Sequence, residues 1–149
     1  MKAETLKIND KVQLSGMFIY NEKDELLLLH KIKHDHYETP GGKVDLTDCK
    51  DSNNPTELDL RNAAIREVFE ELGQGFIFEE PEFVKGIDFI KPDGEIATAN
   101  KFKTKILFGK PIINEPVFDE IKWFSKKDLR KEDSKISPDL KLFLKENLI

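Results

Sequence analysis

Apolar and polar positions divide the first third of the chain into two predicted strands and a long loop. The segment "KVQLSGMFIYNEKDELLLLHKIK", residues 11–33, predicts two strands around the polar turn "NEKDE". Four consecutive leucines at 26–29 form a short run with polar flanks, which favours a buried strand over a helix. Residues 34–57 are polar and contain two glycines and two prolines. This composition is typical of a loop.

The rest of the chain predicts one central helix, further strands and two helices at the end. Residues 58–72, "LDLRNAAIREVFEEL", have helical periodicity and stop at Gly73. Strands are predicted within 76–90 and 98–109, around the turn "KPDGE", and at 120–124. Helices are predicted at 125–131 and 137–149, with Ser125 and Ser137 as N-caps and Pro138 at the first helical position. This order predicts a layered α/β or α+β domain, whose last helix packs on the sheet through Leu140, Phe143, Leu144 and Leu148.

Three glutamates lie together at the end of the central helix. At 100° per residue, Glu67, Glu70 and Glu71 share an arc of roughly 100°. The predicted core face lies opposite this arc and consists of Leu58, Ile65, Val68, Phe69 and Leu72. Like charges at this spacing repel, and negative charge in a last turn opposes the helix macrodipole. This acidic arc has two interpretations. It is either an ordinary solvated helix face, or a site for Mg²⁺ or Mn²⁺, which favour carboxylate and carbonyl oxygens.

Composition narrows the classes of partner. The chain has 149 residues, the size of a single domain spanning 1–149, and a net charge of −5. That charge argues against generic binding to nucleic acid or to anionic membranes. No apolar run reaches the roughly 20 residues of a membrane span. The single cysteine, Cys49, has no internal disulfide partner, which fits a reducing cytoplasm.

Two segments together resemble the signature of the Nudix hydrolase family. That signature reads Gly, five residues, Glu, seven residues, then Arg-Glu, an apolar residue, any residue, Glu-Glu, any residue and Gly. Here "GGKVD" at 41–45 and "REVFEELG" at 66–73 match its two halves. "TPGGK" at 39–43 and "IKWF" at 121–124 also resemble the family, and the likeness extends over roughly residues 10–130.

The resemblance has one clear departure. The signature, about 42–73 in this chain, separates Gly42 from Arg66 by 24 positions where the family has fourteen, so its loop carries a ten-residue insertion. Counting forward from Gly42 puts Asp48 in the place of the first Glu, whereas counting back from Arg66 puts Leu58 there, with Glu57 one place off. Residues 48–55 are polar and predict an exposed loop that does not carry catalysis, and such insertions cost little stability.

The resemblance implies an α/β/α sandwich with a central mixed β-sheet and Mg²⁺-dependent hydrolysis of a phosphoanhydride bond in a nucleotide. It implies Glu67, Glu70, Glu71 and the Gly42 carbonyl as metal ligands, with Mg²⁺ or Mn²⁺ as the cofactor. Divalent cations neutralise the phosphates and lower the pKa of a bound water, and either Glu67 or Glu70 can accept its proton. Arg66 orients one glutamate, for example Glu70 at i+4. A further ligand or base from a distant loop has four candidates: Glu95, Glu115, Asp119 and Glu120.

Substrate contacts and the identity of the substrate stay open at this point. Tyr37, Lys43 and Glu120 are candidates for substrate binding, and Tyr37 can stack on a base or fill space under the loop. His34 and His36 can line the cleft or bind zinc, but two exposed structural histidines are the commoner case. The alternatives to an enzyme are a Nudix-fold binding or sensor module without turnover, and an acidic surface with a calcium or interaction site. Nothing in the sequence indicates the oligomeric state.

Overall fold

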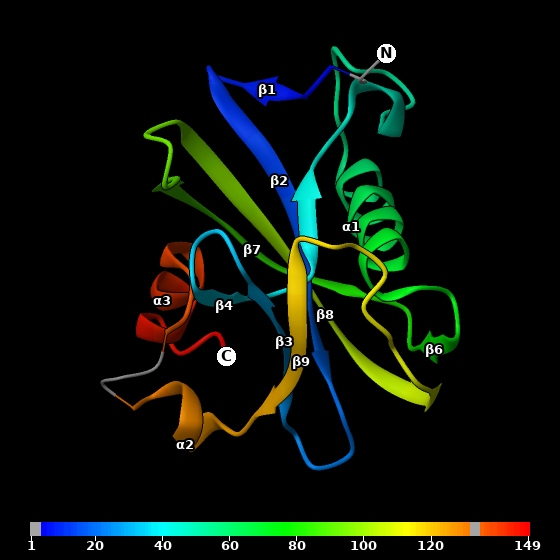
Figure 1. Ribbon diagram of the computed structural model, residues 1–149. Coiled ribbons are helices and arrows are strands. Elements are labelled where there is room, and N and C mark those ends of the chain that lie inside the picture. Colours follow the sequence, from blue (N-terminus) through cyan, green and yellow to red (C-terminus); the bar gives the residue numbers. More distant parts are fainter. Residues whose placement is uncertain (1–3, 132–134) are drawn as a thin grey trace.

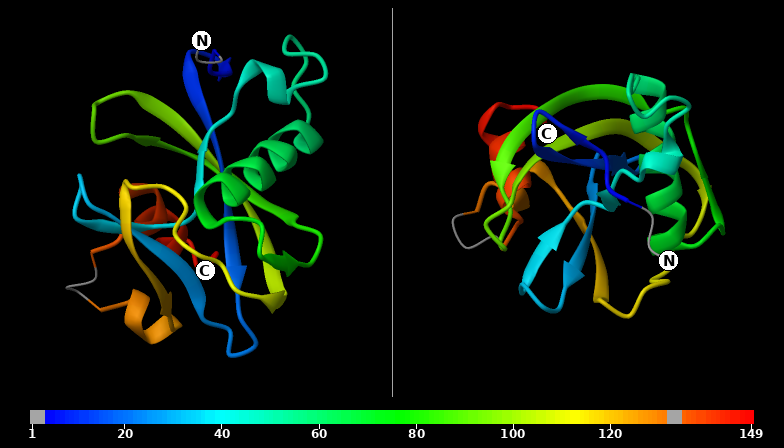
Figure 2. Two further views of the ribbon diagram at one scale, coloured as in Figure 1. Left: turned by 45° about the vertical axis from the view of Figure 1, so that its right-hand side comes forward. Right: turned by 90° about the horizontal axis from the view of Figure 1, so that it is seen from above.

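The computed structural model describes residues 4–131 and 135–149, and it shows one mixed β-sheet with helices on both faces (Figures 1 and 2). The strands of this described part are β1 (Lys7–Ile8), β2 (Lys11–Tyr20), β3 (Leu26–Lys31), β4 (His36–Glu38), β5 (Gly41–Lys43), β6 (Phe76–Phe78), β7 (Glu82–Ile90), β8 (Ile96–Gly109) and β9 (Phe118–Phe124). The helices are α1 (Glu57–Leu72), α2 (Lys126–Leu129) and α3 (Pro138–Lys145), with a 3₁₀ turn, η1, at Leu46–Asp48. The predicted fold class, an α/β/α sandwich with a central mixed sheet, is confirmed.

The sheet is built around a parallel pair of long strands. Strands β2 and β8 run parallel from the pair Val12–Ala97 to the pair Tyr20–Lys105. The other pairings are antiparallel, and the main strand order is β4-β3-β2-β8-β6, with β9 on β3, β7 on β8 and both β1 and β5 on β2. Strand β5 therefore lies beside β2, close to helix α1 (Figure 1).

Helix α1 covers one face of the sheet. The core between them contains Met17, Ile19, Leu27, Leu29, Ala64, Val68, Leu72, Phe76, Phe102 and Phe118. Burying each of the larger side chains contributes about 1.5–3 kcal/mol, so this core fixes the helix on the sheet. The run of leucines at 26–29 is fully buried within β3, as the pattern predicted.

Helix α3 and the C-terminal segment cover the opposite face. Their core contains Phe18, Leu26, Leu28, Ala99, Phe124, Leu129, Ile136, Leu140, Phe143 and Ile149, and Leu144 and Leu148 pack against it. The rings of Phe18 and Phe143 meet edge to face at 5.3 Å. The predicted packing of the last helix is confirmed, but the helix ends at Lys145, before the expected residue 149.

Two predictions from the sequence pattern were wrong in detail. The segment 34–57 is not a continuous loop. It contains β4, which pairs with β3, β5, which pairs with β2, and the 3₁₀ turn η1. Leu58 is 54% exposed instead of buried. It lies on the first turn of α1 and is not part of the two hydrophobic clusters against which Leu60 packs. In residues 4–131 and 135–149, no helix has the length and apolar character needed to cross a membrane.

Candidate active site

Helix α1 carries the three glutamates on its last two turns. Its start is fixed by Thr56, whose hydroxyl accepts the Asp59 N–H at 3.2 Å while the Asp59 carboxylate accepts the Thr56 N–H at 2.9 Å. Its end is Gly73, with φ of 74°, a conformation that favours glycine. Glu70 and Glu71 therefore lie in the last turn, where the helix macrodipole disfavours negative charge.

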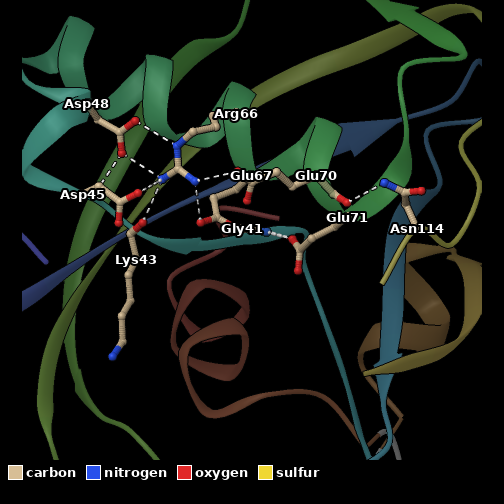
Figure 3. Close-up of polar contacts among 9 residues, drawn as sticks. All are labelled: Gly41, Lys43, Asp45, Asp48, Arg66, Glu67, Glu70, Glu71 and Asn114. Atoms are coloured by element: carbon tan, nitrogen blue, oxygen red, sulfur yellow. Dashed lines mark hydrogen bonds and ion pairs between the residues drawn. The ribbon is translucent and has the colours of Figure 1, made fainter. Parts of the chain in front are cut away.

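Strand β5 brings a glycine backbone against this end of the helix. A Cβ on Gly42 would lie 2.6 Å from the carboxyl group of Glu67, so a side chain at position 42 would displace that carboxyl group. The N–H of Gly41 donates a hydrogen bond to Glu71 Oε1 at 2.6 Å (Figure 3). The pairing of Gly42 with Ser15 on β2 fixes the position of both glycines.

Glu71 is a buried carboxyl group, not part of a solvated face. The residue is only 4% exposed, because the β5 backbone covers it. Burial raises the pKa of Glu71 well above its usual range, and the charges of Glu67, Glu38 and Glu115 raise it further, whereas the hydrogen bond from Gly41 lowers it. The expectation that the carboxylates lie opposite the buried face is therefore wrong for Glu71.

Glu67 lies beside Glu71 and is largely shielded from solvent, with its side chain 15% exposed. Burial raises its pKa to about 7, and the neighbouring Glu70 and Glu115 also raise it, against the lowering effect of Arg66. A carboxyl group with a pKa near 7 can exchange a proton at neutral pH, which is the property required of a general base.

Arg66 connects the glutamates to the loop before the helix. Its Nη1 donates to Glu67 Oε1 and to Glu70 Oε1, each at 3.1 Å (Figure 3). On its other side, Nε and Nη2 donate to the two carboxylate oxygens of Asp48 at 2.9 and 2.8 Å, and Nη2 also donates to the Lys43 carbonyl at 3.1 Å. The predicted contact between Arg66 and Glu70 is present, and Glu67 shares the same nitrogen.

Asp48 occupies the position reached by counting forward from Gly42. Its side chain is 9% exposed, and its Oδ2 also accepts the Asp45 N–H at 2.8 Å. Burial raises the pKa of Asp48, but the hydrogen bonds from Arg66 and Asp45 outweigh this effect and lower it overall. Asp48 therefore belongs to the polar network around Arg66. The expected exposed loop at 48–55 is wrong at its start, because Asp48 and Cys49 are both half-buried and Cys49 packs against the cluster of Leu6, Val44 and Ala63.

A distant loop closes the C-terminal end of α1. The side-chain amide of Asn114 donates to the Glu70 carbonyl at 3.0 Å, and its backbone N–H donates to the Glu71 carbonyl at 2.9 Å. The next residue, Glu115, is close enough that Glu70 raises its pKa, after the larger effect of burial. Of the four candidates for a distant ligand or base, Glu115 is therefore the one that lies beside the glutamates. Asn114 was missed, because nothing in its local sequence indicates that it binds helix carbonyls.

The other distant candidates lie elsewhere. Glu95 belongs to the turn between β7 and β8, where it binds Lys91. Asp119 binds the His30 ring at 2.6 Å. Glu120 pairs with His30 across β3 and β9, and its carboxylate accepts a hydrogen bond from the Tyr37 hydroxyl at 2.5 Å. Tyr37 pairs with the same histidine and packs on the core under α3, so Tyr37 and Glu120 lie on the face of the sheet opposite α1.

A cavity of about 230 Å³ adjoins the two glycines. Its lining includes Gly41, Gly42, Lys43, His34 and His36. The two histidine rings lie 5.2 Å apart, and His36 Nε2 is 2.8 Å from Glu38. The lining also includes Lys101 and Asp139 but none of Glu67, Glu70 and Glu71, so the cavity lies on the α3 side of the glycines, away from the glutamates. Lys43 and both histidines therefore lie beside the glycines without joining the carboxylate cluster, and the described lining does not include Tyr37 or Glu120.

The donor set at the end of α1 has the chemistry that Mg²⁺ or Mn²⁺ requires, namely carboxylate and carbonyl oxygens. Two of its carboxyl groups, Glu67 and Glu71, have raised pKa values, so added positive charge would stabilise their ionised forms. Ser15, paired with Gly42, has a buried Oγ without a hydrogen-bond partner in the described chain. Within residues 4–131 and 135–149, however, no three side chains already converge as a metal site. Instead, Arg66 donates hydrogen bonds to Glu67 and Glu70, and the Gly41 N–H donates one to Glu71.

Comparison with known families gives one match. The model of the NUDIX domain family matches residues 13–145, which is most of the chain. None of the curated proteins matches this chain.

Solved structures of similar fold extend over nearly the whole chain. The MutT NUDIX hydrolase of Burkholderia pseudomallei is 23% identical, with 91% of this chain and 96% of that chain covered and a TM-score of 0.69. The MutT protein of Methanosarcina mazei Go1 is 19% identical, with 94% and 95% covered and a TM-score of 0.71. A C. elegans Ap4A hydrolase is 20% identical, with 92% and 95% covered and a TM-score of 0.64. At these identities, the likeness is one of fold.

Proposed function

This chain belongs to the Nudix family, whose members hydrolyse pyrophosphate bonds, and we propose that it hydrolyses a phosphoanhydride bond in a nucleotide with Mg²⁺ or Mn²⁺ as its cofactor. The observation that carries the proposal is the contact between β5 and the end of α1. There the Gly41–Gly42 backbone lies against Glu67 and Glu71, two shielded carboxyl groups whose pKa values are raised. Structural similarity to an Ap4A hydrolase and to MutT proteins supports a nucleotide as the substrate.

In the proposed site, Glu67, Glu70, Glu71 and the Gly42 carbonyl hold the divalent cation. When bound, the cation supplies charge neutralisation of the phosphates and a lowered pKa for a coordinated water. Arg66, held by Asp48, orients Glu67 and Glu70 toward one another.

Either Glu67 or Glu70 is proposed as the proton acceptor, because the pKa of about 7 for Glu67 belongs to the metal-free protein and a bound cation would lower it. Glu115 is an acidic group from outside the helix that can assist, since it is close enough for its charge to raise the pKa of Glu67. Among the predicted substrate contacts, Lys43 is the one that lines the cavity beside the glycines, on the side away from the glutamates, so we propose it as a contact for a part of the substrate distant from the cation. Tyr37 and Glu120 are not in the described lining of this cavity and are not given this role.

The test is a turnover screen with and without Mg²⁺. Nucleoside triphosphates, nucleotide sugars, ADP-ribose and dinucleoside polyphosphates are offered separately, and release of phosphate, pyrophosphate or mononucleotide is measured. We expect hydrolysis of at least one class that stops in excess chelator and returns with added Mg²⁺. Tight binding of one of these ligands by calorimetry without any product would favour a sensor module instead. Activity that persists in excess chelator would remove the metal from the proposal.

A further inference from the structure

A buried lysine lies behind the glycine segment, on the side away from α1. Lys101, on β8, is 6% exposed. Its ammonium donates to Thr39 Oγ1 at 2.6 Å and lies 3.1 Å from Asp139 Oδ2, near the start of α3. Three chain segments that are distant in sequence thus meet at one cation: the strand β8, the residues that enter β5, and the last helix.

The surrounding backbone makes room for this cation. Lys101 is paired with Gly16 on β2, and a Cβ on Gly16 would lie 2.9 Å from the lysine Nζ and 2.9 Å from the Pro40 carbonyl oxygen. Any side chain at position 16 would therefore displace the ammonium or the Thr39–Pro40 segment. Pro40 is itself fixed, because its carbonyl accepts the Met17 N–H at 3.0 Å.

Stability alone does not account for such a pair. Lys101 and Asp139 have side chains that are only 7% and 13% exposed, and desolvating two charges costs as much as their attraction returns. Apolar residues of similar size are often as stable in such positions or more so. The charged pair instead fixes the orientation of the Lys101 side chain. Asp139 holds the ammonium in place, and the ammonium donates a hydrogen bond to Thr39.

Thr39 is the link to the candidate site. It is 3% exposed and stands two residues before Gly41, whose N–H binds Glu71, and three before Gly42, which lies against Glu67. The residues between Thr39 and Gly42 are consequently held from both sides of the sheet, by Lys101 on the α3 side and by the glutamates on the α1 side.

We propose that Lys101 is a positioning residue, which acts through Thr39 to hold the Gly41–Gly42 backbone against Glu71 and Glu67. The competing explanation is that the Lys101–Asp139 pair only ties α3 to the sheet, in which case the contact with Thr39 has no consequence for the glycines. The expected effect of Lys101 on turnover rests on the proposed function. The expected effect on the glycine backbone is independent of that function.

The two explanations separate when the Thr39 hydroxyl alone is removed. Thr39→Val keeps the shape and leaves the Lys101–Asp139 pair intact, and Thr39→Ser is the matched control that keeps the hydroxyl. We expect hydrogen exchange of the Gly41 amide, followed by NMR, to be at least about tenfold faster in Thr39→Val than in the parent. We expect the Mg²⁺ concentration for half of the thermal stabilisation to rise at least about threefold. With an active substrate, kcat should fall by about tenfold or more, while Thr39→Ser stays near the parent in all three measurements.

If the Thr39→Val protein does not fold, Thr39→Ala is used in its place. Parent-like Gly41 exchange together with a parent-like Mg²⁺ response in the variant would overturn the inference and leave the pair as a tether for α3. If no substrate is turned over by the parent, but Gly41 exchange and Mg²⁺ response change as expected, the positioning role is supported and the proposed hydrolysis alone fails.

Discussion

The Asp48 carboxylate binds the Arg66 guanidinium through two hydrogen bonds, from Nε to Oδ1 at 2.9 Å and from Nη2 to Oδ2 at 2.8 Å. A bidentate pair of this kind fixes the orientation of the guanidinium plane as well as its position. The remaining nitrogen, Nη1, is thereby directed at Glu67 and Glu70, each 3.1 Å away. The loop before the helix thus determines how two of the glutamates are oriented.

Replacing Asp48 by Asn tests this relationship. Asn keeps the size but replaces one acceptor oxygen with an amide group, so Arg66 loses half of the pair and its orientation is no longer fixed. We expect kcat to fall at least about tenfold, and the free energy of unfolding to fall by about 1.5–3 kcal/mol, the usual value of hydrogen bonds to charged groups. Asp51→Asn is the control, because Asp51 is exposed and its carboxylate accepts a local backbone hydrogen bond from Asn53. Equal behaviour of the two variants would contradict the role of Asp48.

The insertion after Asp48 is expected to be dispensable. The Asp59 carboxylate accepts the N–H groups of both Lys50 and Thr56, so the two ends of the loop are held close together. Residues 51–55 can therefore be replaced by two glycines without moving either end. We expect turnover within about tenfold of the parent, or ~1.4 kcal/mol of barrier, measured by steady-state kinetics. A thousandfold loss in a variant with a normal circular dichroism spectrum would place a catalytic contact inside the insertion.

Local patterns predicted the helix and its acidic end well, because helical spacing fixes where Glu67, Glu70 and Glu71 project. The same patterns could not predict that Glu71 is buried, since this depends on β5, a segment thirty residues earlier that was expected to be loop. Spacing also left Asp48 and Leu58 as alternatives. The contact of Asp48 with Arg66 favours Asp48 for this position, and that contact depends on tertiary packing.

The pKa of Glu67 predicts a pH dependence for the metal-free protein. The folded pKa of about 7 lies above the ordinary value of 4.5, so between these values the folded state binds more protons than the unfolded state. The free energy of unfolding should therefore decrease as pH rises from 4.5 to about 7, and this loss should persist above 7. At 1.36 kcal/mol for each pH unit, the loss from this group reaches about 3 kcal/mol. Urea unfolding in the presence of a chelator, at pH values from 5 to 8, measures it.

Glu67→Gln supplies the comparison for this pH dependence. Glutamine does not titrate, so the variant should lose less stability than the parent between pH 5 and 8. Bound Mg²⁺ stabilises the ionised carboxylates, so in the parent the rise in Tm caused by Mg²⁺ should be larger at pH 8 than at pH 6. If the parent and Glu67→Gln have superimposable stability curves, the raised pKa of Glu67 is not supported.

Glu70→Gln and Glu71→Gln should separate function from stability. Glutamine keeps the helix propensity, and at position 71 its amide oxygen can still accept the Gly41 N–H, while the buried charge is removed. We therefore expect metal-free Glu71→Gln to be more stable than the parent at pH 8, because burial and nearby carboxylates disfavour ionised Glu71. The Glu70 side chain is 50% exposed and paired with Arg66, so its replacement should change stability by less than about 1 kcal/mol.

Both swaps should nevertheless lower turnover at saturating Mg²⁺ by at least about 10²-fold, since each removes a proposed metal ligand. Mg²⁺ should also raise the Tm of either variant less than that of the parent, because a ligand stabilises only the state that binds it. Glu57→Gln, on the exposed first turn of the same helix, controls for the loss of a negative charge from α1. Variants at 70 and 71 that melt much earlier than this control, yet keep its turnover and its response to Mg²⁺, would make the two glutamates structural. The raised pKa of Glu71 would then reflect burial alone.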